Sequence, residues 1–304
     1  MDTNIGAKER VTQNRLIGLF KNVLKYTYLG NWETREDNAN IEEKLLTAYL
    51  SRRGYTDKEI RSSIVKLKQS ANSLGGGLYN ANKEVYTFLR YGVNIQAEVT
   101  EKKKMVHLID WANPMENDFQ IAEEVTIQGA SDRRPDLVVY VNGIALAVIE
   151  LKRSTVSAHE GIRQNIRNQQ DGYIPRFFTT IQLLFAGNDT EGLHYGVIKT
   201  PEKFWLRWKE PCGEPCQPSH FTAKEYPNEL DRSVLQFFEP VRLLEYIHDF
   251  IIFDGGIKKT ARPNQYFAVK AAQPRVRKKQ NGIIWHSQGS GKSLTMVWRG
   301  SVDT

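Results

Sequence analysis

The chain has 304 residues, of which 40% are hydrophobic and 25% charged, a composition typical of folded globular proteins and not of disordered ones. Its formal net charge of +7 mildly favours polyanionic partners without requiring them. No apolar run approaches the roughly 18 residues that a membrane span needs, and no signal sequence is visible, so we expect a cytoplasmic protein with no membrane contact.

The first part of the chain is predicted to be helical. Helices are expected at residues 9–29, 40–53, 57–73 and 79–89. The first carries an apolar stripe and is expected to pack on the domain or on a partner. In the second, Leu46 and Leu50 mark the inner face, and Glu43 lies on that face one turn before Leu46.

The next part of the chain favours β-structure. Strands are predicted at residues 93–99, 105–111 and 119–127. A hairpin follows, because the apolar runs Leu137–Val141 and Ala145–Leu151 flank Asn142-Gly143, a dipeptide that favours tight hairpin turns. Helices followed by strands and a hairpin indicate a mixed sheet flanked by helices.

Three charged residues lie at the open end of this hairpin. Asp136 precedes the first strand, and Glu150 and Lys152 project from one face of the second. Paired residues on neighbouring strands lie about 5 Å apart, so Asp136 and Glu150 can meet. Such carboxylates can bind Mg²⁺, and the lysine can act on a water or on a phosphate. The alternative is that charges end these strands only because strand ends are solvated.

A further polar pair follows the hairpin. Gln169 and Tyr173 stand at the end of a predicted helix at 160–170, where an amide and a phenol can contact phosphates or bases. The alternative is a tyrosine that simply packs on the sheet. Strands predicted at 181–186 and 195–200 complete the sheet.

An irregular, proline-rich stretch at 201–227 is interpreted as a boundary or surface connection. Its two cysteines, Cys212 and Cys216, are expected to be reduced loop thiols, because no second Cys or His pair follows at the spacing of a zinc site. Residues 230–250 are predicted to be helical again.

The last fifty or so residues contain a phosphate-binding pattern. Residues 262–269 open a helix that includes Gln265, and Gly282–Trp285 is predicted to be a short buried strand. A loop typical of phosphate binding at a helix N-terminus follows, formed by Gly289, Ser290, Gly291, Lys292 and Ser293. Lys292 would reach the β- and γ-phosphates, and Ser293 would hold Mg²⁺. His286 stands where this pattern normally begins with glycine.

The hairpin motif resembles that of the PD-(D/E)xK nucleases: Pro-Asp, thirteen intervening residues, then Glu-x-Lys. The runs 149–157, 168–180 and 185–196 resemble the motor-nuclease (R) subunit of type I restriction enzymes, and the likeness extends from about residue 40 to 298. The resemblance implies a nuclease fold with Asp136, Glu150 and Lys152 as catalytic residues. It implies Mg²⁺ held by Asp136, Glu150, the Leu151 carbonyl and Glu43, with Glu42 as the alternative to Glu43. It also implies DNA contacts from Gln169 and Tyr173.

The C-terminal pattern resembles superfamily 2 helicases, in which a glutamine matching Gln265 reads adenine. This implies the start of a RecA-like domain that binds ATP; because the chain stops soon after Ser293, the domain is expected to be incomplete and ATP turnover is not expected. The implied organisation is a nuclease domain at 1–200, a connection at 201–229 and the motor start at 230–304.

By the same resemblance, the parent protein would cleave double-stranded DNA after ATP-driven translocation, assembled with methyltransferase and specificity subunits. The alternative is a nucleotide-binding or subunit-docking module whose nuclease fold grips DNA without cutting it.

Overall fold

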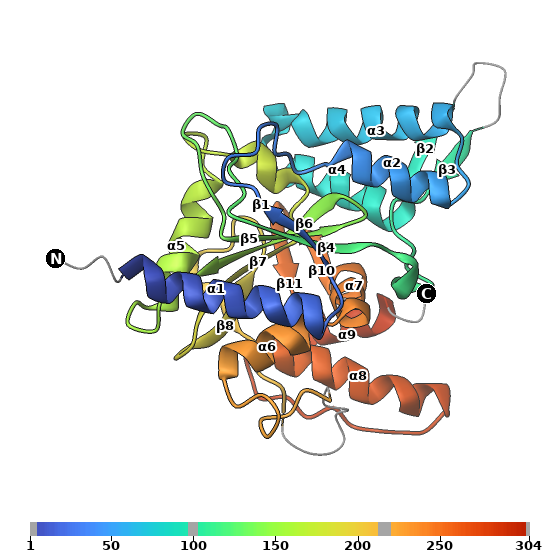
Figure 1. Cartoon of the computed structure of the whole chain (residues 1–304). Helices are drawn as coiled ribbons and strands as arrows, with labels where there is room; N and C mark the ends of the chain where they lie inside the picture. Colours follow the sequence, from blue (N-terminus) through green and yellow to red (C-terminus); the bar gives the residue numbers. More distant parts are fainter. Residues whose placement is uncertain (1–4, 97–102, 212–219, 302–304) are drawn as a thin grey trace.

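A central seven-stranded sheet organises the computed structural model, which describes residues 5–96, 103–211 and 220–301 (Figure 1). The sheet order is β1-β4-β5-β6-β7-β8-β9. Its strands are β1 (Thr27–Asn31), β4 (Phe119–Glu123), β5 (Leu137–Val141), β6 (Ile144–Leu151), β7 (Leu183–Asn188), β8 (Gly192–Gly196) and β9 (Leu206–Arg207). Because β1–β4 and β6–β7 pair in parallel and the other pairs are antiparallel, the sheet is mixed, as predicted.

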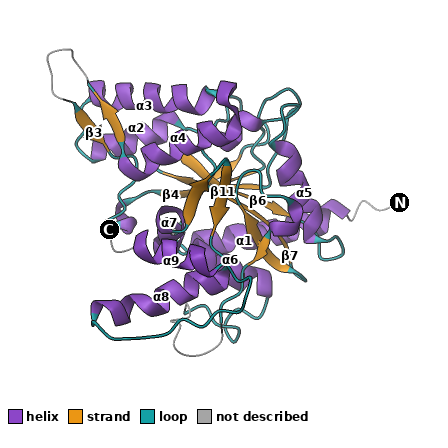
Figure 2. Cartoon of the chain, turned by 180° about the vertical axis from the view of Figure 1, so that it is seen from behind, coloured by secondary structure: helices purple, strands orange, loops and turns teal. Residues whose placement is uncertain are grey.

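Helices surround this sheet (Figure 2). They are α1 (Ile5–Asn22), α2 (Glu43–Arg52), α3 (Asp57–Asn72), α4 (Gly77–Tyr91), α5 (Ala158–Asn168), α6 (Glu229–Phe238), α7 (Pro240–Asp249), α8 (Pro263–Arg277) and α9 (Lys292–Ser301). Two small antiparallel pairs lie outside the sheet, β2 (Val93–Ile95) with β3 (Lys104–Val106) and β10 (Ile251–Asp254) with β11 (Ile257–Thr260). None of the helices within the described ranges has the length and apolar content needed to cross a membrane.

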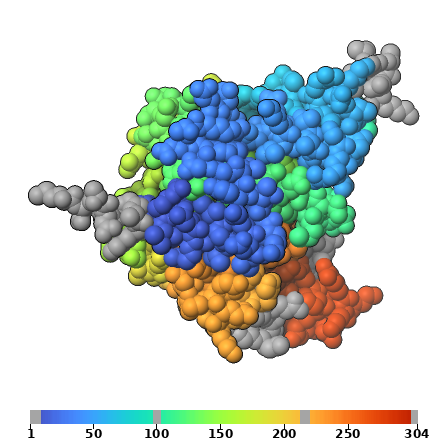
Figure 3. All heavy atoms as spheres, viewed as in Figure 1, coloured from blue at the N-terminus to red at the C-terminus, as the bar shows by residue number. Residues whose placement is uncertain are grey.

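The alternation of side chains along β5 and β6 divides the core between the two faces of the sheet. Val139 and Ile149 belong to the cluster that contains residues of α1, α6 and α7. Val138 and Val148 belong to the cluster that includes Ile162 of α5. Figure 3 shows α1 lying across the surface between the α2–α4 layer and α6. All eight residues of β6 are buried, so this strand is covered on both faces.

The predicted hairpin is present. Asn142 and Gly143 both have positive φ, 53° and 80°, as a two-residue turn of the favoured hand requires. A Cβ on Gly143 would lie 2.8 Å from the Glu42 carbonyl oxygen and from the Leu46 nitrogen, so only glycine lets α2 begin against this turn. The start of α2 is therefore fixed at the turn end of the hairpin.

Tertiary pairing changes several predicted elements. The helix predicted at 9–29 ends at Asn22, and Thr27–Asn31 instead forms β1 beside β4. The strands predicted at 93–99 and 105–111 are reduced to the small β2–β3 pair, and residues 97–102 between them lie outside the described part. Local preference is a weak prior that long-range partners override.

The predicted connection at 201–229 is partly built into the fold. Within it, β9 pairs with β8, and the side chain of Trp208 is fully buried, with its ring centroid 4.7 Å from that of Phe237 and 6.0 Å from that of Tyr246. Helices α6 and α7 join the same core as the sheet, so the described residues show no break in packing at the predicted domain boundary. Cys212 and Cys216 lie outside the described residues.

The buried strand predicted at Gly282–Trp285 does not form. Ile283 and Trp285 are 91% and 89% exposed, and no strand of the described residues lies beside them. A buried strand needs hydrogen-bonding neighbours, and without them this apolar stretch remains an exposed segment.

Candidate active site

The open end of the β5–β6 hairpin brings Asp136 and Glu150 together, as the spacing predicted. The register shifts between Val139 and Tyr140, so that Leu137 pairs with Ile149 and Asp136 lies beside Glu150. The Asp136 carboxylate also accepts a hydrogen bond of 2.6 Å from the Leu151 backbone N–H. The register of the hairpin thus fixes the position of both acidic residues.

Glu150 is fully buried in an environment that opposes its ionisation. Burial raises its pKa well above the ordinary value, and the neighbouring Asp136 carboxylate adds to the rise. Gln164 of α5 donates a hydrogen bond of 2.6 Å to Glu150 Oε2. Glu150 Oε1 is also buried and has no hydrogen-bond partner among the described residues. A buried, unpartnered carboxylate oxygen is costly unless a cation or proton satisfies it.

Asp136 shares this environment. Burial raises its pKa to about 6, although the positive charge of Lys152 and the hydrogen bond from Leu151 oppose the rise. Two neighbouring carboxyl groups with raised pKa values are typical of sites that bind a cation or move a proton.

Lys152 completes the predicted trio. Its Nζ lies 2.9 Å from the Leu151 carbonyl oxygen, to which it donates, and 3.4 Å from Glu9 Oε1. Burial lowers the pKa of Lys152, but the carboxylates of Asp136, Glu150 and Glu9 outweigh it, so the pKa is raised overall. The amine is therefore a positively charged hydrogen-bond donor in this arrangement.

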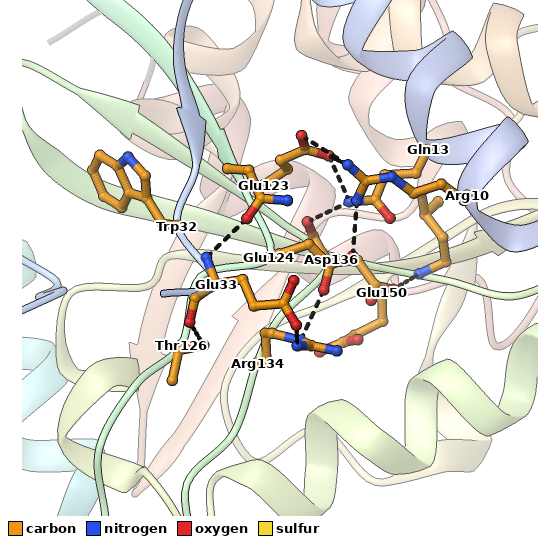
Figure 4. A network of polar contacts seen from close by, with 12 residues as sticks. Arg10, Gln13, Trp32, Glu33, Glu123, Glu124, Thr126, Arg134, Asp136 and Glu150 are labelled. Atoms are coloured by element: carbon orange, nitrogen blue, oxygen red, sulfur yellow. Dashed lines mark hydrogen bonds and ion pairs between the residues drawn. The ribbon is translucent and has the colours of Figure 1, made fainter. Parts of the chain in front are cut away.

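Helix α1 contributes residues that the sequence analysis did not assign to the site. Gln13 donates hydrogen bonds of 3.0 Å to Glu123 Oε2 and of 3.3 Å to the Asp136 carbonyl oxygen (Figure 4). Arg10 pairs with Glu123 at 3.1 Å and with Glu124 at 3.3 Å. Polar residues at helical spacing in the first predicted helix were the available signal, but only its apolar stripe was interpreted.

The predicted metal ligand Glu43 is not brought to this cluster. Glu43 opens α2 at the turn end of the hairpin and pairs with Lys68 on the surface, its side chain 52% exposed. Its alternative, Glu42, forms two hydrogen bonds with Arg35, of 3.0 and 2.6 Å. Six residues of strand separate this turn from Glu150, about 20 Å. The family resemblance implied Glu43, or Glu42 as its alternative, as a metal ligand, but the sequence does not show which end of the hairpin this helix meets.

Gln169 and Tyr173 lie beyond α5 and both have partners within the chain. Gln169 donates to the Asn165 carbonyl oxygen at 2.9 Å and accepts from the Lys199 N–H at 2.7 Å. Arg133 stacks on the Tyr173 ring at 4.1 Å. The amide that touches the acidic pair is instead Gln164, one to two turns earlier on the same helix.

The donor set at the hairpin fits a hard divalent cation such as Mg²⁺. The Asp136 carboxylate, Glu150 Oε1 and the Leu151 carbonyl oxygen are possible metal ligands at the ends of β5 and β6. Of these, Glu150 Oε1 is buried without a hydrogen-bond partner among the described residues. No group of three His, Cys, Asp or Glu side chains within the described ranges is arranged to hold a metal. Mg²⁺ does not require one, because it commonly binds one or two carboxylates and fills its shell with water and substrate phosphate.

The phosphate-loop pattern forms a second, separate arrangement. Gln265 accepts from the Arg262 N–H at 2.8 Å and donates to the carbonyl oxygens of Gly291 at 2.9 Å and Ser290 at 3.3 Å. A Cβ on Gly291 would lie 2.3 Å from Gln265 Nε2, so this contact requires glycine. Lys292 opens α9 and is exposed. The structure therefore brings Gln265 to the loop, where its amide holds the backbone together.

Two models of known protein families match this chain, one over the hairpin site and one over the glycine-rich loop. The family model described as type I restriction enzyme R protein N terminus matches residues 6–203, which include Asp136, Glu150, Lys152 and Gln164. The chain belongs to this family. A second family model, SWI2/SNF2 ATPase, matches residues 264–302, the segment that contains Gln265 and the glycine-rich loop.

Curated relatives carry matching names. The chain is 26% identical to a putative type I restriction enzyme MjaIXP endonuclease subunit of Methanocaldococcus jannaschii, over 96% of this chain and 31% of the relative. It is 31% identical to the putative MjaVIIP endonuclease subunit of the same organism, over 69% of this chain and 20% of the relative. It is 27% identical to the type I restriction enzyme HindI endonuclease subunit of Haemophilus influenzae, over 76% of this chain and 23% of the relative. The chain thus spans a third or less of the length of these relatives.

Proposed function

We propose that this R-protein N-terminal region is a Mg²⁺-dependent DNA endonuclease of the PD-(D/E)xK type. The observation that carries the proposal is that Asp136, Glu150 and Lys152 meet at the open end of the hairpin, where Glu150 Oε1 is buried without a hydrogen-bond partner among the described residues. The matching family and the names of the relatives support a nuclease role in restriction.

Each residue of the site would have a separate role in cleavage. Asp136, Glu150 Oε1 and the Leu151 carbonyl would hold Mg²⁺, which supplies positive charge to the phosphate and lowers the pKa of a bound water. Gln164 orients Glu150 so that one oxygen stays free. Because neighbouring carboxylates keep Lys152 protonated, it would orient the attacking water or neutralise the phosphate as a donor, and not remove a proton itself.

In the longer parent, the C-terminal segment would begin a RecA-like motor that binds ATP. Its phosphate site would comprise Gly289, Ser290, Gly291, Lys292 and Ser293. The match to the SWI2/SNF2 ATPase model and the hydrogen bond from Gln265 to the Gly291 carbonyl oxygen of this loop support that role. Double-stranded DNA and the methyltransferase and specificity subunits of a restriction complex would be its partners, with cleavage following translocation.

The test is calorimetric titration with Mn²⁺ combined with a nuclease assay in Mg²⁺. Asp136→Ala should abolish metal binding because it removes one of the two carboxylate ligands. Glu43→Ala is the matched control and should bind metal like the wild type, since Glu43 pairs with Lys68 far from the site. Equal Mn²⁺ binding by the wild type and Asp136→Ala would overturn the proposal and leave a nuclease fold that only grips DNA or docks a partner.

A further inference from the structure

The loop that carries Asp136 into the site is fixed against the segment that follows α5. The Ala130 N–H donates to the Tyr173 carbonyl oxygen at 3.2 Å. A Cβ on Gly129 would lie 2.3 Å from that same oxygen, so this close approach requires glycine. Ile127 and Arg133 exchange backbone hydrogen bonds of 2.8 and 3.1 Å just before Asp136. The position of Arg133 relative to the site is therefore set by the fold.

Arg133 presents an oriented positive charge. Its guanidinium stacks on the Tyr173 ring at 4.1 Å and donates to Ser131 Oγ at 2.9 Å and to the Asp132 carbonyl oxygen at 2.7 Å. It makes no ion pair within the part of the chain that the structure describes. A guanidinium has five N–H donors, so several remain for a ligand. The carboxylate of Asp132 accepts from the Gly129 N–H at 3.1 Å.

A second unpaired arginine lies on α5, the helix that contacts Glu150 through Gln164. Arg167 follows Gln164 by three residues, a spacing that puts side chains on neighbouring positions of one helix face, about 5–6 Å apart at Cβ. Arg167 is exposed and forms no ion pair with any described residue. Arg163, one turn earlier, differs because it pairs with Glu160 at 2.6 Å and Glu202 at 3.0 Å.

We propose that Arg133 and Arg167 bind backbone phosphates of double-stranded DNA beside the Asp136–Glu150 site, toward the C-terminal end of α5. Guanidinium groups suit this role because their planar N–H donors match phosphate oxygens. The stacking on Tyr173 holds one of them in place before DNA arrives. This inference rests on the proposed nuclease function and deepens it by naming the surface that holds the substrate.

The test is the salt dependence of binding to a fluorescent DNA duplex, measured by anisotropy in metal-free buffer with the whole chain. The logarithm of the association constant falls linearly with the logarithm of the salt concentration, and each lost phosphate contact should make this slope less steep by about 0.9. Arg133→Gln and Arg167→Gln should each lower the slope by that amount, and Arg167→Lys should keep it. Arg163→Gln is the matched control and should leave the slope unchanged, because its charge is already neutralised.

The proposal would be overturned by wild-type slopes in both Arg133→Gln and Arg167→Gln, or by an equal loss in Arg163→Gln. Absence of salt-dependent duplex binding by the wild type, or stronger binding of a single strand, would also overturn it. Because Arg167 is exposed, its variant reports on binding even if Arg133→Gln disturbs the fold. Mn²⁺ titration separates the two proposals: the arginine variants should keep metal binding, whereas Asp136→Ala tests the nuclease assignment alone.

Discussion

At the scale of single residues, the acidic pair is unfavourable for the fold on its own. Glu150 is buried among apolar strands, and Asp136 lies beside it, so neither carboxylate ionises as readily as in water. Gln164 donates to one oxygen of Glu150, and the other oxygen has no hydrogen-bond partner in the part of the chain that the structure describes. Such an arrangement is common where function requires groups that stability does not favour.

Asp136→Asn should therefore stabilise the metal-free protein above about pH 6. The folded Asp136 keeps its proton up to about pH 6, whereas the unfolded residue releases it near 3.8. Between these values the folded state binds more protons, so the free energy of unfolding falls as pH rises through that window and stays lower above it. Asparagine cannot ionise and can still accept from the Leu151 N–H.

Denaturant unfolding at about pH 8 should show a gain of about 1–3 kcal/mol for Asp136→Asn, and no gain at about pH 3, where both forms are neutral. An equal gain at both pH values would contradict the titration argument. Divalent metal should stabilise the wild type and leave the variant unchanged.

At the scale of elements, the beginning of the segment predicted as a connection between domains, residues 201–209, joins the sheet and the core. Strand β9 extends the sheet beyond β8, and Trp208, which follows it, packs among aromatic side chains of α6, α7 and α8. The irregular sequence around it contains several prolines and charges, which suggest an exposed connection. The complete burial of Trp208 nevertheless shows that this part of the segment belongs to the core.

Trp208→Ala should lower the free energy of unfolding by about 3–5 kcal/mol, the usual cost of removing a fully buried large aromatic side chain. The nearby Phe204 is 56% exposed and serves as the control. Phe204→Ala should change stability by less than about 0.5 kcal/mol. Chemical unfolding of both variants checks this, and equal small effects would show that 201–209 is a loose connection after all.

At the scale of the whole molecule, two lysines serve two separate arrangements. Lys152 follows β6 beside the acidic pair, and Lys292 opens α9 beside the glycine-rich loop. Between them, β11 leads to Ala261, whose carbonyl oxygen accepts from Tyr195 of the sheet at 2.8 Å, and Gln265 then holds the loop. The loop is thus tied to the sheet through the chain that connects them.

On the proposed function, Lys152→Ala in a full-length R subunit assembled with the proposed partner subunits should abolish DNA cleavage while ATP hydrolysis and DNA binding survive. If Lys152 acts on the attacking water or the phosphate as proposed, its contribution belongs to the transition state, and one phosphate contact among many adds little to affinity. Lys292→Ala should stop ATP hydrolysis and, through it, cleavage. Side-by-side ATPase and cleavage assays test this. Normal cleavage by the Lys152→Ala enzyme would remove the hairpin from the chemistry.

The sequence alone determined the turn of the hairpin and the approximate position of its acidic residues. A register shift between Val139 and Tyr140 places Asp136 opposite Glu150, whereas a regular two-residue hairpin would pair Asp136 with Ile149. The turn itself is specified locally by Asn142-Gly143. The same holds for α3, whose capping box at Thr56 and Glu59 marks its start. In both elements the residues that specify the local structure lie close in the chain, so local chemistry was sufficient.

Only the tertiary structure decided which distant residues meet that pair. Gln13 from α1 and Gln164 from α5 reach the site, whereas Glu43 lies at the opposite end of the hairpin. Helical periodicity tells which residues share a face but not which part of a sheet that face covers. Packing of whole elements sets that choice, and it also buried Trp208 and left Trp285 exposed.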